Sequence, residues 1–319
     1  MDLRYDRWRH TLGVLTAVST LVLIFVGGLV TSTGSGLSVP DWPLSYGMLM
    51  PPMVGGVFYE HGHRMVASFV GLLTLVLAVW TARAEARRGV RRLAWLALLA
   101  VVLQGLLGGL TVLFYLPPSI SIAHACLAQT FLCLTVALAY ATSREWLEHA
   151  DGVSGAGRVF AAGRLATAAV FVQLLLGALM RHAGAGLAIP TFPLAFGRLV
   201  PPLDDALVAL HFAHRVGAVL VAGTVGYLAW RAQASSQRRL SWLGWALGAL
   251  VVLQIALGGL AVLTGKAVTP TTLHVALGAA ILGGCFLLTL RARRLGQGEA
   301  PRLRAAAPAV AASSLKAWS

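Results

Sequence analysis

LGVLTAVSTLVLIFVGGLV, residues 12–30, is an apolar run long enough to cross a bilayer as a single helix. About 20 helical residues, at 1.5 Å each, span a hydrocarbon core of roughly 30 Å. Similar runs recur along the 319 residues, of which 58% are apolar and only 11% are charged. Soluble domains carry about 25% charged residues. The composition therefore excludes a water-soluble globule and predicts an all-α protein that crosses a membrane several times.

Arg4, Arg7 and Arg9, which precede this run, imitate the start of a secretory signal. The run is too long for such a signal and no small-residue cleavage site follows it, so we expect a retained first span. In all, eight spans are predicted, at residues 11–31, 61–82, 93–115, 119–142, 160–181, 208–230, 240–264 and 269–292.

The basic residues predict the orientation of these spans. Twenty of the 25 Lys and Arg residues fall on or near the side that holds both termini, and short loops rich in Lys and Arg stay in the cytoplasm. We therefore expect both termini inside and the long loops 32–60 and 182–207 outside. We interpret the basic clusters as topology signals. The net charge of +14 is therefore assigned to contact with the lipid bilayer, and no nucleic acid partner is expected. All three cysteines lie within apolar runs, so no disulfide framework is predicted.

The second half of the chain repeats the first at an offset of 150 residues. Gly27, Gly34, Gly36, Pro40, Pro43, Gly47, Gln104, Gly108, Gly109 and His124 recur as Gly177, Gly184, Gly186, Pro190, Pro193, Gly197, Gln254, Gly258, Gly259 and His274. The pair His63-Arg64 returns one residue further on, as His214-Arg215. Each copy has an even number of spans, so both enter the membrane in the same direction. We expect two tandem four-helix bundles, residues 1–142 and 160–294, with a cytoplasmic linker at 143–159 and a cytoplasmic tail at 295–319.

Four histidines lie at matching depth near the outer ends of predicted spans: His63, His124, His214 and His274. Ionisable groups inside spans are costly and usually functional. A lone histidine in a span is often only a hydrogen-bonded polar residue, but a pair repeated at one depth favours metal ligation. Zinc normally takes three or four protein ligands, whereas haem iron accepts two opposed imidazoles. The pattern therefore predicts one haem iron in each half, bound by His63 and His124 and by His214 and His274.

The two halves differ beside the first histidine. Glu60 lies three residues before His63, on the same helix face, and His211 takes its place in the second half. A carboxylate at the positive start of a helix is the alternative, but that role would have suited both copies. We therefore expect a reactive first half and an electron-carrying second half. Arg64 and Arg215 are candidates for contacts with haem propionates, or for side chains that extend to the lipid headgroups.

The stretch GSGLSVPDWPL, residues 34–44, followed by Glu60-x-x-His63-Arg64, resembles the first outer loop and second span of haem A synthases. The eight spans, the duplication and the four histidines extend this resemblance over nearly all of residues 1–292. The resemblance implies an oxidoreductase of the bacterial cytoplasmic membrane that oxidises the C8 methyl of haem O to a formyl group. Two successive hydroxylations would yield haem A for terminal oxidases.

The same resemblance implies a role for each site residue. His63 and His124 would bind the iron of the substrate haem O, and His214 and His274 would hold a resident haem b for electron transfer. Glu60 matches the family's proposed catalytic carboxylate. Implied partners are haem O synthase, oxidase assembly factors and an electron acceptor or donor such as quinone. Several bacterial members carry a cysteine pair in their outer loops; loops 32–60 and 182–207 contain no cysteine, so this chain is expected to belong to a cysteine-free branch.

Two other functions fit parts of the sequence. A dihaem membrane cytochrome would pass electrons from quinol without altering its haems, with Glu60 as a proton acceptor. A haem or small-molecule transporter built from parallel repeats would place its site near the middle of the membrane. The polar residues cluster at the outer end instead, and the haem-modifying enzyme also accounts for the difference at Glu60.

Overall fold

The computed structural model describes residues 5–147, 152–235 and 237–297. Eight long helices make up most of it: α1 (Arg7–Ser32), α2 (Gly56–Ala84), α3 (Arg88–Leu113), α4 (Pro118–Ala141), α6 (Ala156–His182), α7 (Ala206–Gln233), α8 (Arg238–Leu263) and α9 (Val268–Gly296). All eight are long and apolar enough to cross a membrane, which confirms the predicted all-α membrane fold. The short helices are α5 (Arg144–Leu147) and the 3-10 helix η1 (Ala185–Leu187). Residues 148–151 of the expected linker and 298–319 of the expected tail lie outside the described residues.

Two of the long helices begin at a side chain that caps them. Asp6 accepts hydrogen bonds from the backbone N–H groups of Trp8 and Arg9 at the start of α1, at 3.0 and 3.2 Å. Asp205 accepts two equivalent bonds at the start of α7. These carboxylates satisfy N–H groups that have no partner within the helix and favour its positive end.

Helix α2 begins at Gly56, earlier than the start predicted at residue 61. Its first turns therefore contain Glu60 and His61, and both are buried. They are buried because the preceding loop folds over them. The backbone N–H of Val39 donates to Glu60, and the hydroxyl of Ser45 lies 2.8 Å from Nδ1 of His61.

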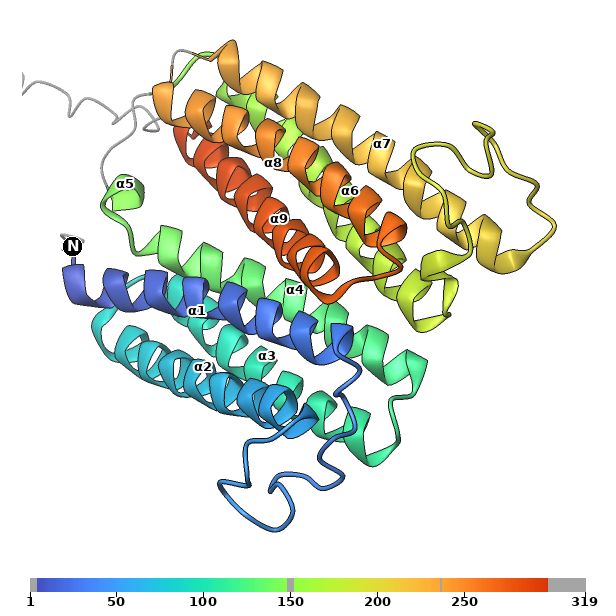
Figure 1. Ribbon diagram of the computed structural model, residues 1–319. Helices are drawn as coiled ribbons and strands as arrows, with labels where there is room; N and C mark the ends of the chain where they lie inside the picture. The colour runs from blue at the N-terminus through green and yellow to red at the C-terminus, as the bar shows by residue number, and fades with distance from the viewer. Residues whose placement is uncertain (1–4, 148–151, 236, 298–319) are drawn as a thin grey trace, which may run out of the picture.

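The helices form two four-helix bundles that lie side by side (Figure 1). In each bundle, α1–α4 or α6–α9, neighbouring helices pack in chain order and the last helix packs back on the first. Helices α1 and α4 of one bundle contact α9 of the other, and α4 also contacts α6. Ile24, Leu132 and Ala279 form the buried apolar cluster of this seam.

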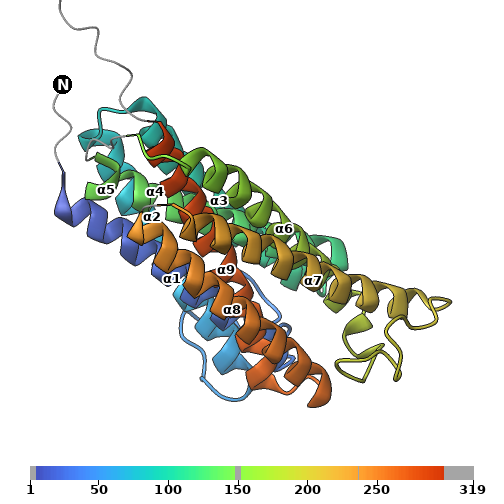
Figure 2. The same cartoon turned by 90° about the horizontal axis from the view of Figure 1, so that it is seen from above.

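The connections divide the molecule into two ends (Figures 1 and 2). The start of α1, the end of α9 and the short connections α2–α3 and α7–α8 lie at what we call the termini end. The first long loop, residues 33–55, and the second long loop, residues 183–205, lie at the loop end. All the candidate site residues named above lie at or near the loop end of their helices.

The same close helix contact occurs in both bundles. A Cβ on Gly13 of α1 would lie 3.3 Å from Cα of Ala139 in α4, and a Cβ on Gly163 of α6 would overlap the side chain of Thr289 in α9. Gly163 and Thr289 follow Gly13 and Ala139 by 150 residues. Small residues let membrane helices approach closely, so the first and last helices of each bundle meet at equivalent points.

Candidate functional site

Each predicted ligand histidine lies with its ring against a glycine of a neighbouring helix. The pairs are His63 with Gly27, His124 with Gly108, His214 with Gly177 and His274 with Gly258. A Cβ on these glycines would lie 2.9–3.2 Å from Cε1 of the facing ring. A side chain at these positions would therefore require the facing ring to shift. The glycines that recur in the sequence thus make room for the histidines that recur with them.

His214 and His274 face each other across the second bundle, with ring centroids 6.5 Å apart. When two imidazoles bind one metal ion from opposite sides, each with its ligating nitrogen about 2 Å from the ion, their ring centroids lie roughly 6 Å apart. The spacing therefore fits two axial ligands. Within the described residues, no three His, Cys, Asp or Glu side chains gather into a metal site. This ligand set does not fit zinc, which needs three or four protein ligands, and it fits haem iron.

The two bundles differ in the contacts of the second ring nitrogen. Nδ1 of His214 lies 3.1 Å from the amide nitrogen of Gln173, and Nδ1 of His274 lies 3.0 Å from the backbone oxygen of Gln254. A histidine that binds a metal through Nε2 usually donates its Nδ1–H to an acceptor. The Gln254 carbonyl can accept this bond from His274, whereas the Gln173 amide nitrogen only donates, so its side chain would have to turn its oxygen toward a metal-bound His214. In the first bundle Nδ1 of His63 is buried without a hydrogen-bond partner among the described residues, whereas the backbone of Gln104 lies beside His124 as that of Gln254 lies beside His274.

Gln173 reaches His214 because Gly217 leaves space for it. The Gln173 amide also donates to the backbone oxygen of His214 at 2.7 Å, and a Cβ on Gly217 would overlap this amide. The corresponding residues of the first bundle, Leu23 and Val66, pack together in an apolar cluster. Sequence reasoning missed Gln173. The signal was available, because a polar residue with a glycine partner replaces two apolar residues of the repeat.

Glu60 and Arg64 fasten the first long loop to α2. Glu60 is 4% exposed; its Oε2 accepts a hydrogen bond from the N–H of Val39 at 2.8 Å, and its Oε1 pairs with Nη2 of Arg64 at 2.7 Å. Nη1 of Arg64 donates to the carbonyl oxygens of Asp41 and Leu44, both at 2.8 Å. The carboxylate is therefore held in one position at the loop end of the bundle.

The second long loop is fastened by equivalent contacts. The N–H of Ile189 donates to Nδ1 of His211 at 3.2 Å, and Nη2 of Arg215 donates to the carbonyl oxygens of Ile189 and Thr191 at 3.0 and 2.6 Å. Ile189 corresponds to Val39, so Glu60 and His211 accept the same backbone hydrogen bond. The difference between Glu60 and His211 is therefore compatible with one shared structural role in holding the loop, beside which the catalytic role expected of Glu60 stays a prediction. A carboxylate and an imidazole can both accept this backbone hydrogen bond, and only the carboxylate of Glu60 adds a negative charge.

Asp41 organises the tip of the first long loop. Its carboxylate accepts hydrogen bonds from the N–H groups of Tyr46 and Gly47 at 2.7 and 2.8 Å. These two bonds hold the pKa of Asp41 below its ordinary value of 3.8. In the second loop Thr191 takes its place and accepts from the N–H of Phe196 at 2.9 Å. The tip is therefore held by an ionisable acceptor in one loop and by a hydroxyl in the other.

The sequence profile of the cytochrome oxidase assembly proteins matches residues 10–55 and 54–287 of this chain. The chain belongs to this family. The heme A synthase of Symbiobacterium thermophilum is 36% identical over 256 residues, which are 77% of this chain and 82% of that protein. The heme A synthase of Halalkalibacterium halodurans is 31% identical over 278 residues, 82% of this chain and 89% of that protein. The family resemblance predicted from the loop motif and the histidines is thereby confirmed.

Two further features of this chain concern its cysteines and a second buried histidine, His61. Its cysteines lie in helices, Cys126 and Cys133 in α4 and Cys285 in α9, and none is in a disulfide. Sequence reasoning also missed His61, which contacts Ser45 under the first long loop. The corresponding residues of the second half are Phe212 and Ala195. Polar contacts under the loop are therefore more numerous in the first half.

We expect the hold of Asp41 on the loop tip to depend on pH. Because the folded-state pKa is lowered, this stabilisation is complete above the ordinary pKa of 3.8 and is lost as the pH falls through the lower folded-state value. Hydrogen exchange at Tyr46 and Gly47, corrected for intrinsic rates, should accelerate at the acid end. Asp41→Thr copies the non-titrating acceptor of the second loop and should remove this pH dependence. An identical acid acceleration in Asp41→Thr would show that another group controls the loop tip.

Proposed function

We propose that this protein is a haem A synthase that oxidises the C8 methyl of haem O to a formyl group by successive hydroxylations. The observation that carries the proposal is the pair of partly buried histidines in each bundle, with every ring against a glycine, in a chain whose relatives are named heme A synthase. The 6.5 Å separation of His214 and His274 supports haem as the bound group. When bound, haem iron supplies the redox chemistry that no side chain of the protein provides.

The histidine contacts support a division of labour between the bundles. His274 has a backbone carbonyl that can accept its Nδ1–H, as expected of a permanent ligand, and the Gln173 side chain lies within hydrogen-bonding distance of Nδ1 of His214. We assign the resident haem b to His214 and His274. His63 lacks such a partner, which suits a site whose occupant must enter and leave. We assign the substrate haem O to His63 and His124.

Glu60 is proposed as the catalytic carboxylate of the first bundle. It lies three residues before His63 on α2, and Arg64 and the Val39 N–H hold it in place. A fixed negative charge at this position would orient water or stabilise positive charge that develops at the substrate methyl carbon. His211 in the second bundle has the same backbone contact and no carboxylate. The proposed reaction is therefore confined to the first bundle.

Arg64 and Arg215 are proposed to contact haem propionates as a second task. Their Nη atoms donate to loop carbonyls, and the Nε–H of each guanidinium stays available for a charge-assisted hydrogen bond. An arginine already fixed by the loop would bind a propionate with little further loss of side-chain freedom. The loops would thus position the groups that orient the haem.

We also propose the location and the partners. The excess of basic residues at the termini end supports a bacterial cytoplasmic membrane with both termini in the cytoplasm and both long loops outside. The proposed chemistry requires a supply of haem O and a route for electrons. Haem O synthase, oxidase assembly factors and a quinone are the partners that fit these needs.

The reaction is tested by co-expressing the chain with a haem O synthase and measuring the mass of haems extracted from the membranes. We expect a formyl-bearing product, with a hydroxymethyl species at short times. Membranes that lack this chain are the control. Unchanged haem O, together with haem b in the purified chain, would contradict the proposal and favour a dihaem cytochrome that only transfers electrons.

Glu60→His tests the carboxylate without releasing the loop. The variant carries the residue that holds the second loop, so the hydrogen bond from Val39 is expected to persist. Loss of a positioned acid–base group typically costs 10²–10⁴-fold in rate, and we expect the formyl product to fall by at least about 100-fold while the haem b content stays unchanged. The matched control, His211→Glu, should keep activity. Wild-type product formation by Glu60→His would remove the carboxylate from the mechanism.

Gln173→Leu tests the assignment of the resident haem. It gives the second bundle the residue found at Leu23, and removes the hydrogen-bonding partner of His214. Loss of such a partner typically weakens metal binding by about 10- to 100-fold, so purified protein should retain less haem b, measured by absorbance of the extracted pigment. The reciprocal variant Leu23→Gln should leave the haem b content unchanged. Equal haem b in wild type and Gln173→Leu would contradict the assignment.

A further inference from the structure

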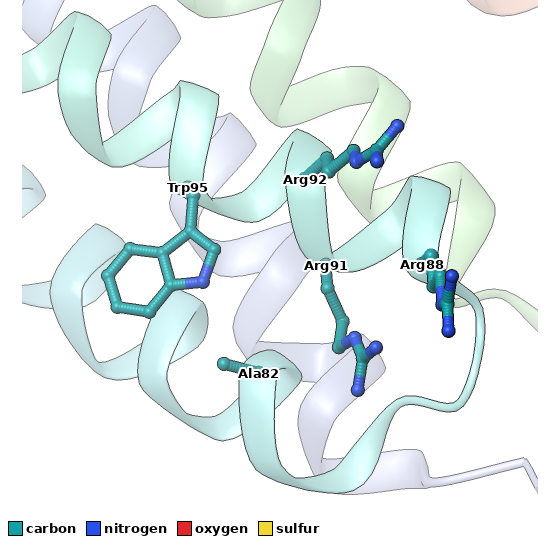
Figure 3. Close-up of a pocket in the computed structure, with 5 residues that line it drawn as sticks. All are labelled: Ala82, Arg88, Arg91, Arg92 and Trp95. Atoms are coloured by element: carbon teal, nitrogen blue, oxygen red, sulfur yellow. The ribbon is translucent and has the colours of Figure 1, made fainter.

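The termini end of the molecule carries a pocket that the proposed reaction does not use. It has a volume of about 500 Å³ and is lined by Ala82 at the end of α2 and by Arg88, Arg91, Arg92 and Trp95 of α3 (Figure 3). Spacings of three and four residues place the four α3 side chains on one face of the helix. Three cations therefore line one pocket at the positive start of a helix, which itself favours an anion.

The charges of this pocket are not neutralised within the described part of the chain. Other arginines at the same end do have carboxylate partners. Arg9 and Arg87 pair with Glu85 at 3.3 and 2.9 Å, and Arg239 and Arg291 pair with Glu145 at 3.6 and 3.2 Å. Residues 5–147, 152–235 and 237–297 provide no such partner for Arg88, Arg91 or Arg92. The structure thus leaves together three guanidinium groups that can bind an external anion.

The same face of α3 becomes apolar and exposed immediately beyond the pocket. Trp95 is 49% exposed, and Leu99, Val102 and Leu106 follow on this face with about half of their surface exposed. The face therefore begins with a basic pocket, continues with an indole ring and ends in an apolar stripe. An anionic phospholipid has the matching order of groups, from a phosphate to acyl chains. Basic pockets between membrane helices bind such headgroups.

The second bundle provides an internal comparison. The positions that correspond to Arg88, Arg91, Arg92 and Trp95 are Arg238, Ser241, Trp242 and Trp245. The hydroxyl of Ser241 donates to the backbone of Ala232, and two of the three cations are missing. A general requirement for positive charge at this end of the membrane applies equally to both bundles. It does not explain why three arginines line one pocket in the first bundle, whereas the equivalent positions of the second bundle hold one arginine.

We propose that the pocket formed by Arg88, Arg91, Arg92, Trp95 and Ala82 binds the headgroup of one anionic phospholipid, with its acyl chains along the exposed face of α3. Guanidinium groups suit this ligand because they bind phosphate oxygens in pairs. The site lies at the opposite end of the bundle from the histidines. The proposal depends on the membrane position of α3 and is independent of the haem reaction.

The test compares lipids that differ only in headgroup charge. The full-length chain in detergent is titrated with phosphatidylglycerol and with phosphatidylcholine of identical acyl chains, and the bound lipid is counted by native mass spectrometry. We expect one phosphatidylglycerol to bind preferentially. Since each arginine near a membrane surface contributes about 1 kcal/mol toward an anionic lipid, the double variant Arg91→Gln/Arg92→Gln should lose roughly 30-fold of this preference. Each single variant should lose roughly fivefold.

The control variant is Arg238→Gln/Arg239→Gln, which removes the same charge from the equivalent helix start of the second bundle. It should keep the preference. Equal binding of the two lipids by wild type would overturn the proposal, as would equal losses in the two double variants. Inorganic phosphate is added in a parallel titration. Displacement of the lipid by millimolar phosphate would identify a free-anion site instead, and retention of the lipid supports the phospholipid. If the double variant does not fold, the two single variants decide.

Discussion

The rings of the four site histidines each pack closely against the facing helix, at a point where that helix has a glycine. In a membrane, helices gain little from apolar burial against one another, so close contact and polar contacts determine how they associate. At Gly27, Gly108, Gly177 and Gly258, a Cβ would lie 2.9–3.2 Å from an imidazole carbon. The glycine leaves room for each ring against the facing helix. The 6.5 Å approach of His214 and His274 depends on this room.

The spans and the histidines could be predicted because the bilayer constrains them strongly. A span must be apolar for about 20 residues, and an imidazole inside one is conspicuous. The offset of 150 residues then identified the equivalent positions. The contacts of Glu60 could not be predicted in this way. Its loop partner Val39 is distant in sequence, and its counterpart His211 belongs to another chemical class, although both side chains accept the same backbone hydrogen bond.

The start of α2 shows the same limit. Apolarity alone places the start of the span at His61, after Glu60, since a carboxylate interrupts an apolar run. The structure begins the helix at Gly56 because the first long loop supplies hydrogen bonds to both side chains. Polar side chains at the start of α2 can therefore be buried, because the loop provides their hydrogen-bond partners. Hydropathy does not register such burial, because the partners come from outside the helix.

The differences between the bundles are concentrated around one histidine of each pair. Beside His124 and His274 the chain keeps the same residues: a glycine faces each ring, and the amides of Gln104 and Gln254 donate to the histidine backbone at 3.0 and 2.9 Å. Beside the other histidine the pairs differ: Leu23 and Gln173, Val66 and Gly217, Glu60 and His211, His61 and Phe212. Substitutions there change the polarity around His63 in α2 or His214 in α7. They retain the packing of α4 and α9, which also form the seam between the bundles. The proposed substrate site and the proposed cofactor site therefore differ on one side of each bundle. Polar contacts can change on that side without altering the helix packing that the two bundles share.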